Sequence, residues 1–333
     1  MGQTEQKANP NVYAVKLVSD KKRQKSQSGG AFTAAAESIL SMGGVVYGVG
    51  WDKELKVVYK RIDTLKGLNE LKGSKYVQAH SGGIYLTVEK DLQKGTLVLF
   101  SGTPCLVNGL YKYLESKACE TEKLYTCDIV CHGTPSPQIY EKYLELLKKE
   151  KGDGIRKFTF RDKSFGWRRN ISSYVVKGRK MITPNYIRIF ESQLCLRKAC
   201  FECSYASMNR VGDITVGDFW GIEKCHPEFE DKKGVSLLIC SSKKGQALFD
   251  KMKDKLVVLK TTPQNCLQPN LQRPTKKPEA YEEFWQYLEE NGYEAAVKKY
   301  CGYNPQDDWE KLEPHQFIKR VSRKIERLIK RKK

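Results

Sequence analysis

The stretch "TLVLFSGTPCLVNGLYKYLES" (residues 96–116) joins an apolar run to an amphipathic segment. The run "TLVLFSG" (96–102) predicts a buried strand, and the segment after it predicts a helix with Pro104 in its first turn. The same order recurs downstream, where "KLYTCDIVCHG" (123–133) predicts a buried strand and "SPQIYEKYLELLKKEKG" (136–152) predicts an amphipathic helix. Two successive strand–helix pairs indicate a sheet covered by helices.

The residues before this stretch continue the alternation. Strands are expected in "VVYGVGW" (45–51) and "KVVYKRI" (56–62), which are rich in β-branched and aromatic residues. Helices are expected over 29–44, 64–76 and 83–95. The sequence therefore predicts an α/β (mixed α+β) fold, in which a mixed sheet has helices on its flanks.

The second half of the chain has fewer helical segments. Extended structure is expected over 155–162, 172–178 and 213–221, with a cysteine-bearing loop between the last two. A strand–helix unit follows over 235–252, and a Pro-rich stretch after 262 leads into helix. We place soft boundaries near residues 150 and 265, which gives the segments 1–150, 151–265 and 266–333.

Composition limits the class of protein. The 333 residues are 40% hydrophobic and 29% charged, which is typical of a soluble globular protein. No apolar run approaches the ~18 residues of a membrane span, and no signal peptide is recognisable, so a cytoplasmic location is expected. The eleven cysteines are then expected to be reduced thiols or metal ligands.

The formal net charge is +20, but the charge is uneven. The last 18 residues (316–333) carry nine Lys or Arg and one Glu. Apolar residues recur among these charges at roughly helical spacing, which leaves two interpretations of the tail. It forms either an amphipathic helix on an anionic membrane surface, at the inner face of the membrane, or a terminal helix docked on the domain.

Four cysteines form the main candidate site. In "LCLRKACFEC" (194–203), Cys200 and Cys203 have C-x-x-C spacing, which lets two sulfurs point into one site. Cys105 and Cys131 each follow a predicted strand and precede a helix, at the end of a parallel sheet where active sites gather. Four thiolates from these loops are suited to an iron–sulfur cluster or a zinc ion. A redox pair or buried small hydrophobic side chains remain as alternatives.

A second candidate site is the turn before the helix at 29–44. Ser26, Ser28, Gly29 and Gly30 allow close approach of a ligand to the backbone, and free N–H groups at a helix start attract phosphate. The alternative is a serine cap with a tight turn. Lys75 lies in a polar loop farther on, where the alternative is a solvated lysine.

Taken in order, seven blocks of the chain resemble the coenzyme F420 hydrogenase/dehydrogenase beta-subunit family. The resemblance covers roughly residues 12–245. The blocks are "SQSGGAFTAAAESILSMGGVVYGVGWD", "LKGSKYVQ", "LFSGTPCLVNGL", "DIVCHGTPSPQIYEKYL", "FRDKSFGW", "LRKACFECSYAS" and "VGDITVGDFWGI".

This resemblance implies an iron–sulfur flavoprotein oxidoreductase that contains a 4Fe-4S cluster and FAD or FMN. Members pass electrons between iron–sulfur partners and a flavin, and on to a small hydride-accepting substrate. The segment 1–150 is then the flavin-binding half, 151–265 the cluster-binding half that closes the same domain, and 266–333 a basic helical extension. The implied cluster ligands are Cys105, Cys131, Cys200 and Cys203. The turn at Ser28, Gly29 and Gly30 is expected near the flavin phosphates, and Lys75 near the flavin.

The chain departs from many bacterial relatives in two ways. They begin with a ferredoxin module, whereas the first cysteine here is Cys105. A ferredoxin-like or other redox partner is therefore expected to supply any further relay. Leu106 also stands where relatives often have Gln.

Two other predictions concern single residues. His132 is a candidate proton donor near the flavin or hydrogen-bond donor to the cluster, with a structural histidine as the alternative. Asp218 and Trp220 in "GDFWG" are expected to be packing and turn residues, with a contact to cofactor or substrate as the alternative.

A different class of function remains open. Four cysteines could hold structural zinc in a non-redox accessory or binding protein. No nucleic-acid-binding motif is present, so no nucleic-acid partner is expected.

Overall fold

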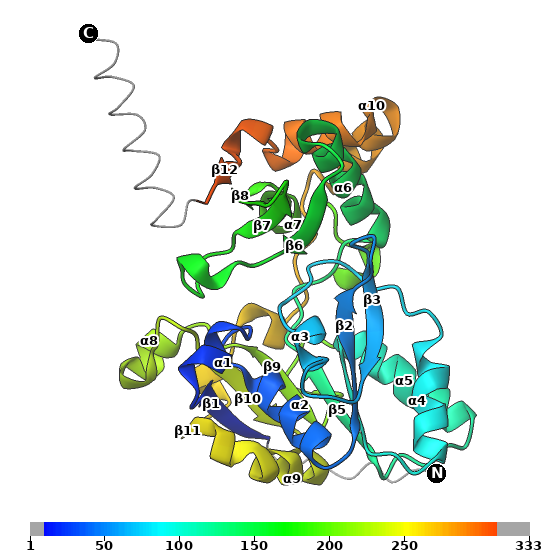
Figure 1. Ribbon diagram of the computed structural model, residues 1–333, viewed down its shortest axis with the longest axis vertical. Coiled ribbons are helices and arrows are strands. Elements are labelled where there is room, and N and C mark those ends of the chain that lie inside the picture. The colour runs from blue at the N-terminus through cyan, green and yellow to red at the C-terminus, as the bar shows by residue number, and fades with distance from the viewer. Residues whose placement is uncertain (1–9, 312–333) are drawn as a thin grey trace.

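The computed structural model describes residues 10–311 and contains two sheets joined by helices (Figure 1). The large sheet has eight strands in the order β11-β1-β10-β9-β5-β4-β2-β3, and the small sheet has four in the order β12-β8-β7-β6. This architecture confirms the predicted α/β fold with a mixed sheet. The basic tail lies outside the described residues. Within them, no helix is both long and apolar enough to cross a membrane.

The centre of the large sheet is parallel and its outer pairings are antiparallel. Strands β2, β4, β5 and β9 pair in parallel, whereas β3, β10, β1 and β11 join through antiparallel pairs. The strands of this sheet are β1 (Asn11–Leu17), β2 (Val45–Trp51), β3 (Val57–Ile62), β4 (Val98–Gly102), β5 (Leu124–Ile129), β9 (Ile214–Asp218), β10 (Ser236–Cys240) and β11 (Leu256–Thr261).

Helices cover both faces of the large sheet because alternate side chains of each strand point in opposite directions. On β4, Leu99 packs in the cluster that contains α2 (Ala31–Ser41) and α9 (Lys243–Met252). Val98 and Phe100 pack on the other face with α4 (Ile84–Gln93) and α5 (Pro104–Ser116). The short helices of this unit are α1 (Asp20–Gln24), α3 (Leu68–Leu71) and α8 (Ile222–Cys225).

The small sheet forms a second unit, above the large sheet in Figure 1. It contains β6 (Ile155–Thr159), β7 (Ser172–Val176), β8 (Arg179–Thr183) and β12 (Trp309–Glu310). Helices α6 (Pro137–Lys151), α7 (Asn185–Glu191) and α10 (Tyr281–Cys301) accompany it. Its core is aromatic: Tyr140, Tyr143, Phe158, Phe160 and Tyr186 form a network of tilted and edge-to-face rings.

The segment 151–265 contributes to both sheets. Its first part supplies β6, β7 and β8, and its last part supplies β9, β10 and β11 of the large sheet. Of the segment 266–333, the described part gives α10 and β12, which belong to the small-sheet unit.

The predicted helix over 64–76 was wrong in extent. Only Leu68–Leu71 is helical, because Lys72 adopts extended backbone angles and Gly73 has a φ of +84°. Both conformations end a helix. Strands β1, β8, β11 and β12 and helices α1, α7 and α8 were not predicted.

A buried ion pair holds the cysteine loop on the large sheet. Asp128 of β5 and Arg210 are 0% and 2% exposed, and Arg210 Nη2 lies 3.0 Å from Asp128 Oδ1. Arg210 also donates to the carbonyl oxygens of Tyr205, Ser207 and Ile129, while the second oxygen of Asp128 accepts from the backbone N–H groups of Val211 and Gly212. These bonds fix residues 205–212 against the end of β5.

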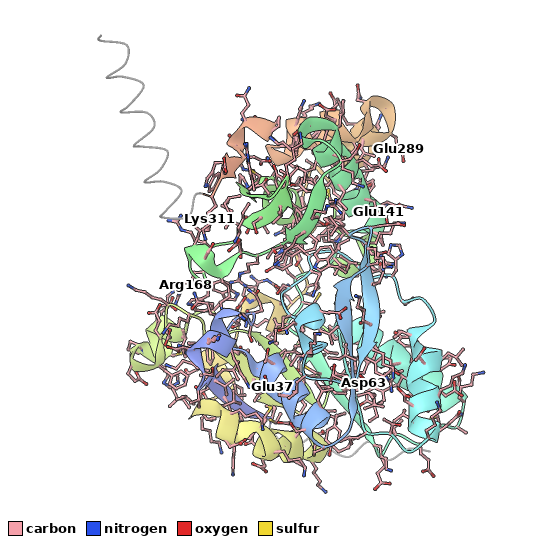
Figure 2. The ribbon with its side chains drawn as sticks, in the orientation of Figure 1. Glu37, Asp63, Glu141, Arg168, Glu289 and Lys311 are labelled. Carbon is pink, nitrogen blue, oxygen red and sulfur yellow. The ribbon has the colours of Figure 1, made fainter. Side chains whose placement is uncertain are left out.

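We predict that Arg210→Met lowers the free energy of unfolding by about 3–5 kcal/mol, because Asp128 would remain buried without its cationic partner. Urea unfolding measures this loss. Arg168→Met is the matched control: Arg168 lies at the periphery (Figure 2), where it pairs with Glu223 and Glu230. An exposed pair contributes about 1 kcal/mol or less. Equal losses in the two variants would contradict the role given to Arg210.

Candidate functional site

A cavity of about 930 Å³ lies at the carboxyl ends of the central parallel strands. Gly48 of β2, Ser101 of β4, Ile129 of β5 and Gly217 of β9 line it. Residues 71–79 and 268–276 supply further parts of the wall, and Arg161 reaches it from the small-sheet unit. Ligand sites of parallel α/β sheets form at this edge, as the sequence analysis expected.

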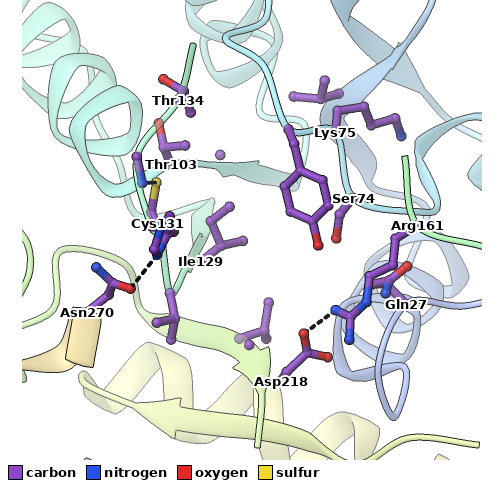
Figure 3. A pocket seen from close by; sticks show the side chains of 18 of the residues that line it. Gln27, Ser74, Lys75, Thr103, Ile129, Cys131, Thr134, Arg161, Asp218 and Asn270 are labelled. Carbon is purple, nitrogen blue, oxygen red and sulfur yellow. Dashed lines mark hydrogen bonds and ion pairs between the residues drawn. The ribbon is translucent and has the colours of Figure 1, made fainter. Parts of the chain in front are cut away.

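Cys131 and Cys105 both line this cavity. Cys131 follows β5, and Cys105 is in the first turn of α5, directly after β4. Figure 3 shows Cys131 beside Thr103 and Thr134. Burial, with a smaller effect of the nearby thiols of Cys105, Cys200 and Cys203, raises the pKa of Cys131 to about 12. All three thiols therefore lie within electrostatic range of Cys131.

The loop that carries Cys200 and Cys203 reaches Cys131 through backbone pairing. Pro135 forms an antiparallel bridge with Leu196, and the backbone N–H of Thr134 donates to Cys200 Sγ at 3.5 Å. Gly133 makes this approach possible: its φ is +113°, and a Cβ there would lie only 3.2 Å from Cys200 Cβ. Cys105 and Cys131 thus share one cavity, and Cys200 lies beside the segment that follows Cys131, with Cys203 on the same loop as Cys200.

The other cysteines lie elsewhere, and all eleven are unpaired thiols. Cys127 is fully buried in the core beside α2 and α9, so it packs rather than faces the cavity. Cys195 is buried next to Cys301 and shares a hydrogen bond with it. Across residues 10–311, no group of three or more His, Cys, Asp or Glu side chains is arranged to hold a metal ion.

His132 also lines the cavity. Residues of the segment 268–276 fix its orientation through hydrogen bonds. Its Nδ1 lies 3.2 Å from Asn270 Oδ1, and Asn270 Nδ2 donates to Thr275 Oγ1. Thr275 in turn donates to the carbonyl oxygen of His132 at 2.6 Å. The ring packs against Phe190 at 5.6 Å between centroids. No feature of the sequence indicated that this Pro-rich segment contributes to the site.

The turn before α2 is fixed tightly to the large sheet. A Cβ on Gly29 would lie 2.2 Å from the carbonyl oxygen of Val15, so only glycine fits there. The N–H of Gly29 donates to Ser236 Oγ at 2.8 Å. Lys163 Nζ donates to the carbonyl oxygens of Arg23, Ser26 and Ser28 at 2.8–2.9 Å, which ties the small-sheet unit to this turn.

The predicted phosphate-binding residues of this turn lie in different environments. Ser28 and Gly30 line the cavity, but Ser28 Oγ donates to the carbonyl oxygen of Val235. The Ser26 hydroxyl bonds to the Lys22 carbonyl oxygen and to Thr33 Oγ1 inside the structure. The first residues of α2, from Ala31 to Thr33, line the cavity with Gly30.

The far end of the cavity contains Arg161, for which the sequence analysis made no prediction, and Asp218, which it expected to be a packing or turn residue. Arg161 donates to Asp218 and to the carbonyl oxygen of Trp167, and it lies over the ring of Trp220 at 5.4 Å. Figure 3 shows Gln27 beside the Arg161–Asp218 pair. Buried atoms at this end have no partner: Gln27 Nε2, Arg161 Nε and Asp218 Oδ1. The family-like blocks "FRDKSFGW" and "VGDITVGDFWGI" were the only available signal for Arg161 and Asp218.

Lys75 lies in the cavity wall, where Figure 3 shows it near Ser74. Its Nζ donates to the carbonyl oxygens of Leu71 and Lys72 at 3.1 and 3.0 Å. Burial, and then the nearby Lys60, lower the pKa of Lys75 from 10.5 to about 7. Burial has this sign because it disfavours the charged amine.

We therefore predict that Lys75 becomes reactive as an amine at a lower pH than an ordinary lysine. Its competitive acetylation, followed by mass spectrometry, should reach half its limiting rate near pH 7, the value to which its pKa is lowered. Exposed Lys112 on α5 corrects for the chemistry of the reagent. A midpoint at the ordinary 10.5 would contradict this environment for Lys75.

Comparison with known proteins agrees with this geometry. A search of curated proteins gave no match. A solved chain of the F420-reducing nickel–iron hydrogenase complex from Methanosarcina barkeri, studied as a xenon derivative, has a similar fold with a TM-score of 0.54. The two are 14% identical, and the match covers 95% of this chain and 100% of that chain. A family model for the C terminus of the coenzyme F420 hydrogenase/dehydrogenase beta subunit matches residues 95–265, which is 171 of the 333 residues. The chain therefore belongs to the coenzyme F420 hydrogenase/dehydrogenase beta-subunit family.

Proposed function

We propose that this chain is an iron–sulfur flavoprotein oxidoreductase of the cytoplasm, which binds a 4Fe-4S cluster and a flavin in adjacent parts of one cavity. One observation carries the proposal. Cys105 and Cys131 line the same cavity as the start of α2, and Cys200 and Cys203 lie within electrostatic range of Cys131. Family membership independently supports a redox role.

The donor set suits an iron–sulfur cluster. Thiolates are soft ligands that favour iron–sulfur clusters and zinc over hard cations. In a four-iron cluster each thiolate binds a different iron, so the four sulfurs need not meet at one point. Backbone N–H groups of Gly133 and Thr134 already donate to Cys131 Sγ and Cys200 Sγ. Such bonds stabilise negative charge on sulfur and tune the reduction potential of a bound cluster.

The remaining cavity suits a flavin. The whole cavity, including the cysteine end, has a volume of about 930 Å³, which is in the usual range for organic cofactor sites. Buried polar atoms without partners lie at its wall, namely Gln27 Nε2, Tyr59 Oη, Arg161 Nε and Asp218 Oδ1. Burial of such atoms is costly unless a ligand satisfies them. They provide both donors and acceptors for the polar edge of a flavin, FAD or FMN.

The residues of the chain then have separate tasks. A cluster supplies single electrons, whereas a flavin supplies two electrons as hydride. Asn270 and Thr275 hold His132 in one orientation. With Nδ1 engaged by Asn270, Nε2 is the nitrogen that can give or take a proton during reduction of a small hydride acceptor. Exposed Cys105 marks the side from which a redox partner protein would deliver electrons.

The second candidate, a non-redox protein with structural zinc, rests on the same four cysteines. It does not account for the unpartnered polar atoms at the far end of the cavity. Metal analysis distinguishes the two functions directly.

We predict that protein purified without oxygen contains about four iron and four sulfide per chain, with a bound flavin. Cys131→Ser should lose most of the iron, because serine is a poor ligand for the cluster. Cys119→Ser is the matched control: Cys119 is also partly exposed but lies past the end of α5, away from the cavity. Iron, sulfide and flavin analysis together with the visible spectrum provides the measurement.

A colourless protein with one zinc per chain would reject the redox proposal. Equal iron loss in the Cys131 and Cys119 variants would reject the ligand assignment alone.

A further inference from the structure

Two buried cysteines outside the candidate site lie in contact inside the small-sheet unit. Cys195 is 1% exposed and Cys301 is 7% exposed, and their side chains are hydrogen-bonded to each other. Both belong to the core that α6, α7 and α10 share. The two residues are far apart in the chain, so the fold alone brings their sulfurs together. Sulfurs in hydrogen-bond contact need only a small further approach to form a disulfide.

The thiol pair has polar neighbours inside this apolar core. Cys301 Sγ lies 3.5 Å from Ser192 Oγ, and the Tyr293 hydroxyl lies within electrostatic range of both thiols. Tyr293 is 8% exposed, and its hydroxyl oxygen is buried without a hydrogen-bond partner. Polar atoms of this kind are costly to bury, and packing alone does not require them. The pair therefore differs from Cys127, which packs among apolar side chains beside α2 and α9.

The hydrogen bond between the thiols makes one sulfur more acidic than the other. It raises the pKa of Cys195 and lowers the pKa of Cys301, because it stabilises negative charge on the Cys301 sulfur. The thiolate is the nucleophile in thiol–disulfide exchange. Cys301 is also the sulfur nearer to solvent, since it is the last residue of α10 and the next residue, Gly302, is exposed.

The position of the pair connects α10 to the cysteine loop. Cys195 lies at the base of that loop, and the carbonyl oxygen of the next residue, Leu196, accepts a hydrogen bond from the Tyr281 hydroxyl at the first residue of α10. Cys301 lies at the opposite end of the same helix. A covalent bond between Cys195 and Cys301 would therefore attach the second end of α10 to the base of the loop.

We propose that Cys195 and Cys301 form a reversible disulfide, which ties the end of α10 to the base of the cysteine loop when the protein meets a small-molecule disulfide as oxidant. The Cys301 thiolate attacks the oxidant, forms a mixed disulfide and releases one thiolate of the oxidant. That thiolate takes the proton of Cys195. The Cys195 sulfur then attacks the Cys301 sulfur and releases the second thiolate, which takes up the proton that Cys301 had lost.

The balance of this exchange is simple. Two protein S–H bonds are replaced by one S–S bond, and the oxidant gains two electrons and two protons to become two thiols. Neither step uses a cluster or a flavin. The disulfide site is therefore independent of the function proposed above.

The test is disulfide mapping of the whole chain, purified without oxygen and equilibrated with graded ratios of hydroxyethyl disulfide and its thiol. Free thiols are blocked with N-ethylmaleimide, and tryptic peptides are identified by mass spectrometry without reduction. We expect linked peptides that contain Cys195 and Cys301, and recovery of both thiols with dithiothreitol. Because the cross-link closes a long loop and restricts the unfolded chain, the thermal unfolding midpoint should rise by about 5 °C.

Variants assign this effect to the pair. Cys301→Ala should abolish the linked peptides and the rise in the unfolding midpoint. Cys240→Ala is the matched control, because Cys240 is also buried, at 4% exposure, but lies at the end of β10 in the large sheet. This control should form the same linked peptides as the wild type. Mapping of the wild-type protein tests the proposal even where a variant is too unstable to purify.

The opposite results are equally clear. Absence of the linked peptides at every ratio of oxidant to thiol, or their formation only in urea-unfolded protein, would overturn the proposal. A disulfide from either cysteine to a different partner, in place of this pair, would overturn it as well. Linked peptides in protein that never contains iron or flavin would refute the proposed function and leave the disulfide standing.

Discussion

The buried ion pair between Asp128 and Arg210 is the constraint on which the candidate site depends. Arg210 follows the loop of Cys200 and Cys203, and Asp128 lies on β5, just before Cys131. Two charges removed from water are costly to bury, and only their mutual attraction and the additional hydrogen bonds offset that cost. The ion pair and the hydrogen bonds around it therefore act together to offset the cost of burying the two charges. The network selects one position of the cysteine loop relative to the end of β5, which is what a site made from separate segments requires.

The second requirement is that the small-sheet unit stays at the carboxyl edge of the large sheet. Lys163 anchors it there through three carbonyl oxygens of the turn before α2. Arg161, two residues away, connects to Asp218 at the end of β9. Arg161 and Asp218 also line the cavity, so residues that join the units border the space for ligands. Because these residues have both roles, polar and cationic side chains occupy that part of the junction in place of an apolar core.

This arrangement leaves some charged and polar side chains in energetically unfavourable environments. Lysines without carboxylate partners and buried polar atoms without hydrogen bonds are features that folding alone disfavours. Some of these unpartnered atoms, such as Arg161 Nε and Asp218 Oδ1, lie at the cavity, while others, such as Tyr140 Oη, lie in the aromatic core of the small-sheet unit. A ligand in the cavity could satisfy the unpartnered groups that line it.

The sequence by itself determined the elements whose signal is local. The strand–helix pairs over 96–152 follow from apolar periodicity and from prolines at helix starts, and the C-x-x-C spacing marks Cys200 and Cys203. The helix expected over 64–76 failed because backbone conformation at Lys72 and Gly73 overrides the periodicity. Only the tertiary structure decided which segments share a sheet, that Cys131 faces the cavity while Cys127 is core, and that Asn270 and Arg161 join the site. These properties depend on contacts between residues far apart in the chain, and the spacing of residues along a segment carries no information about them.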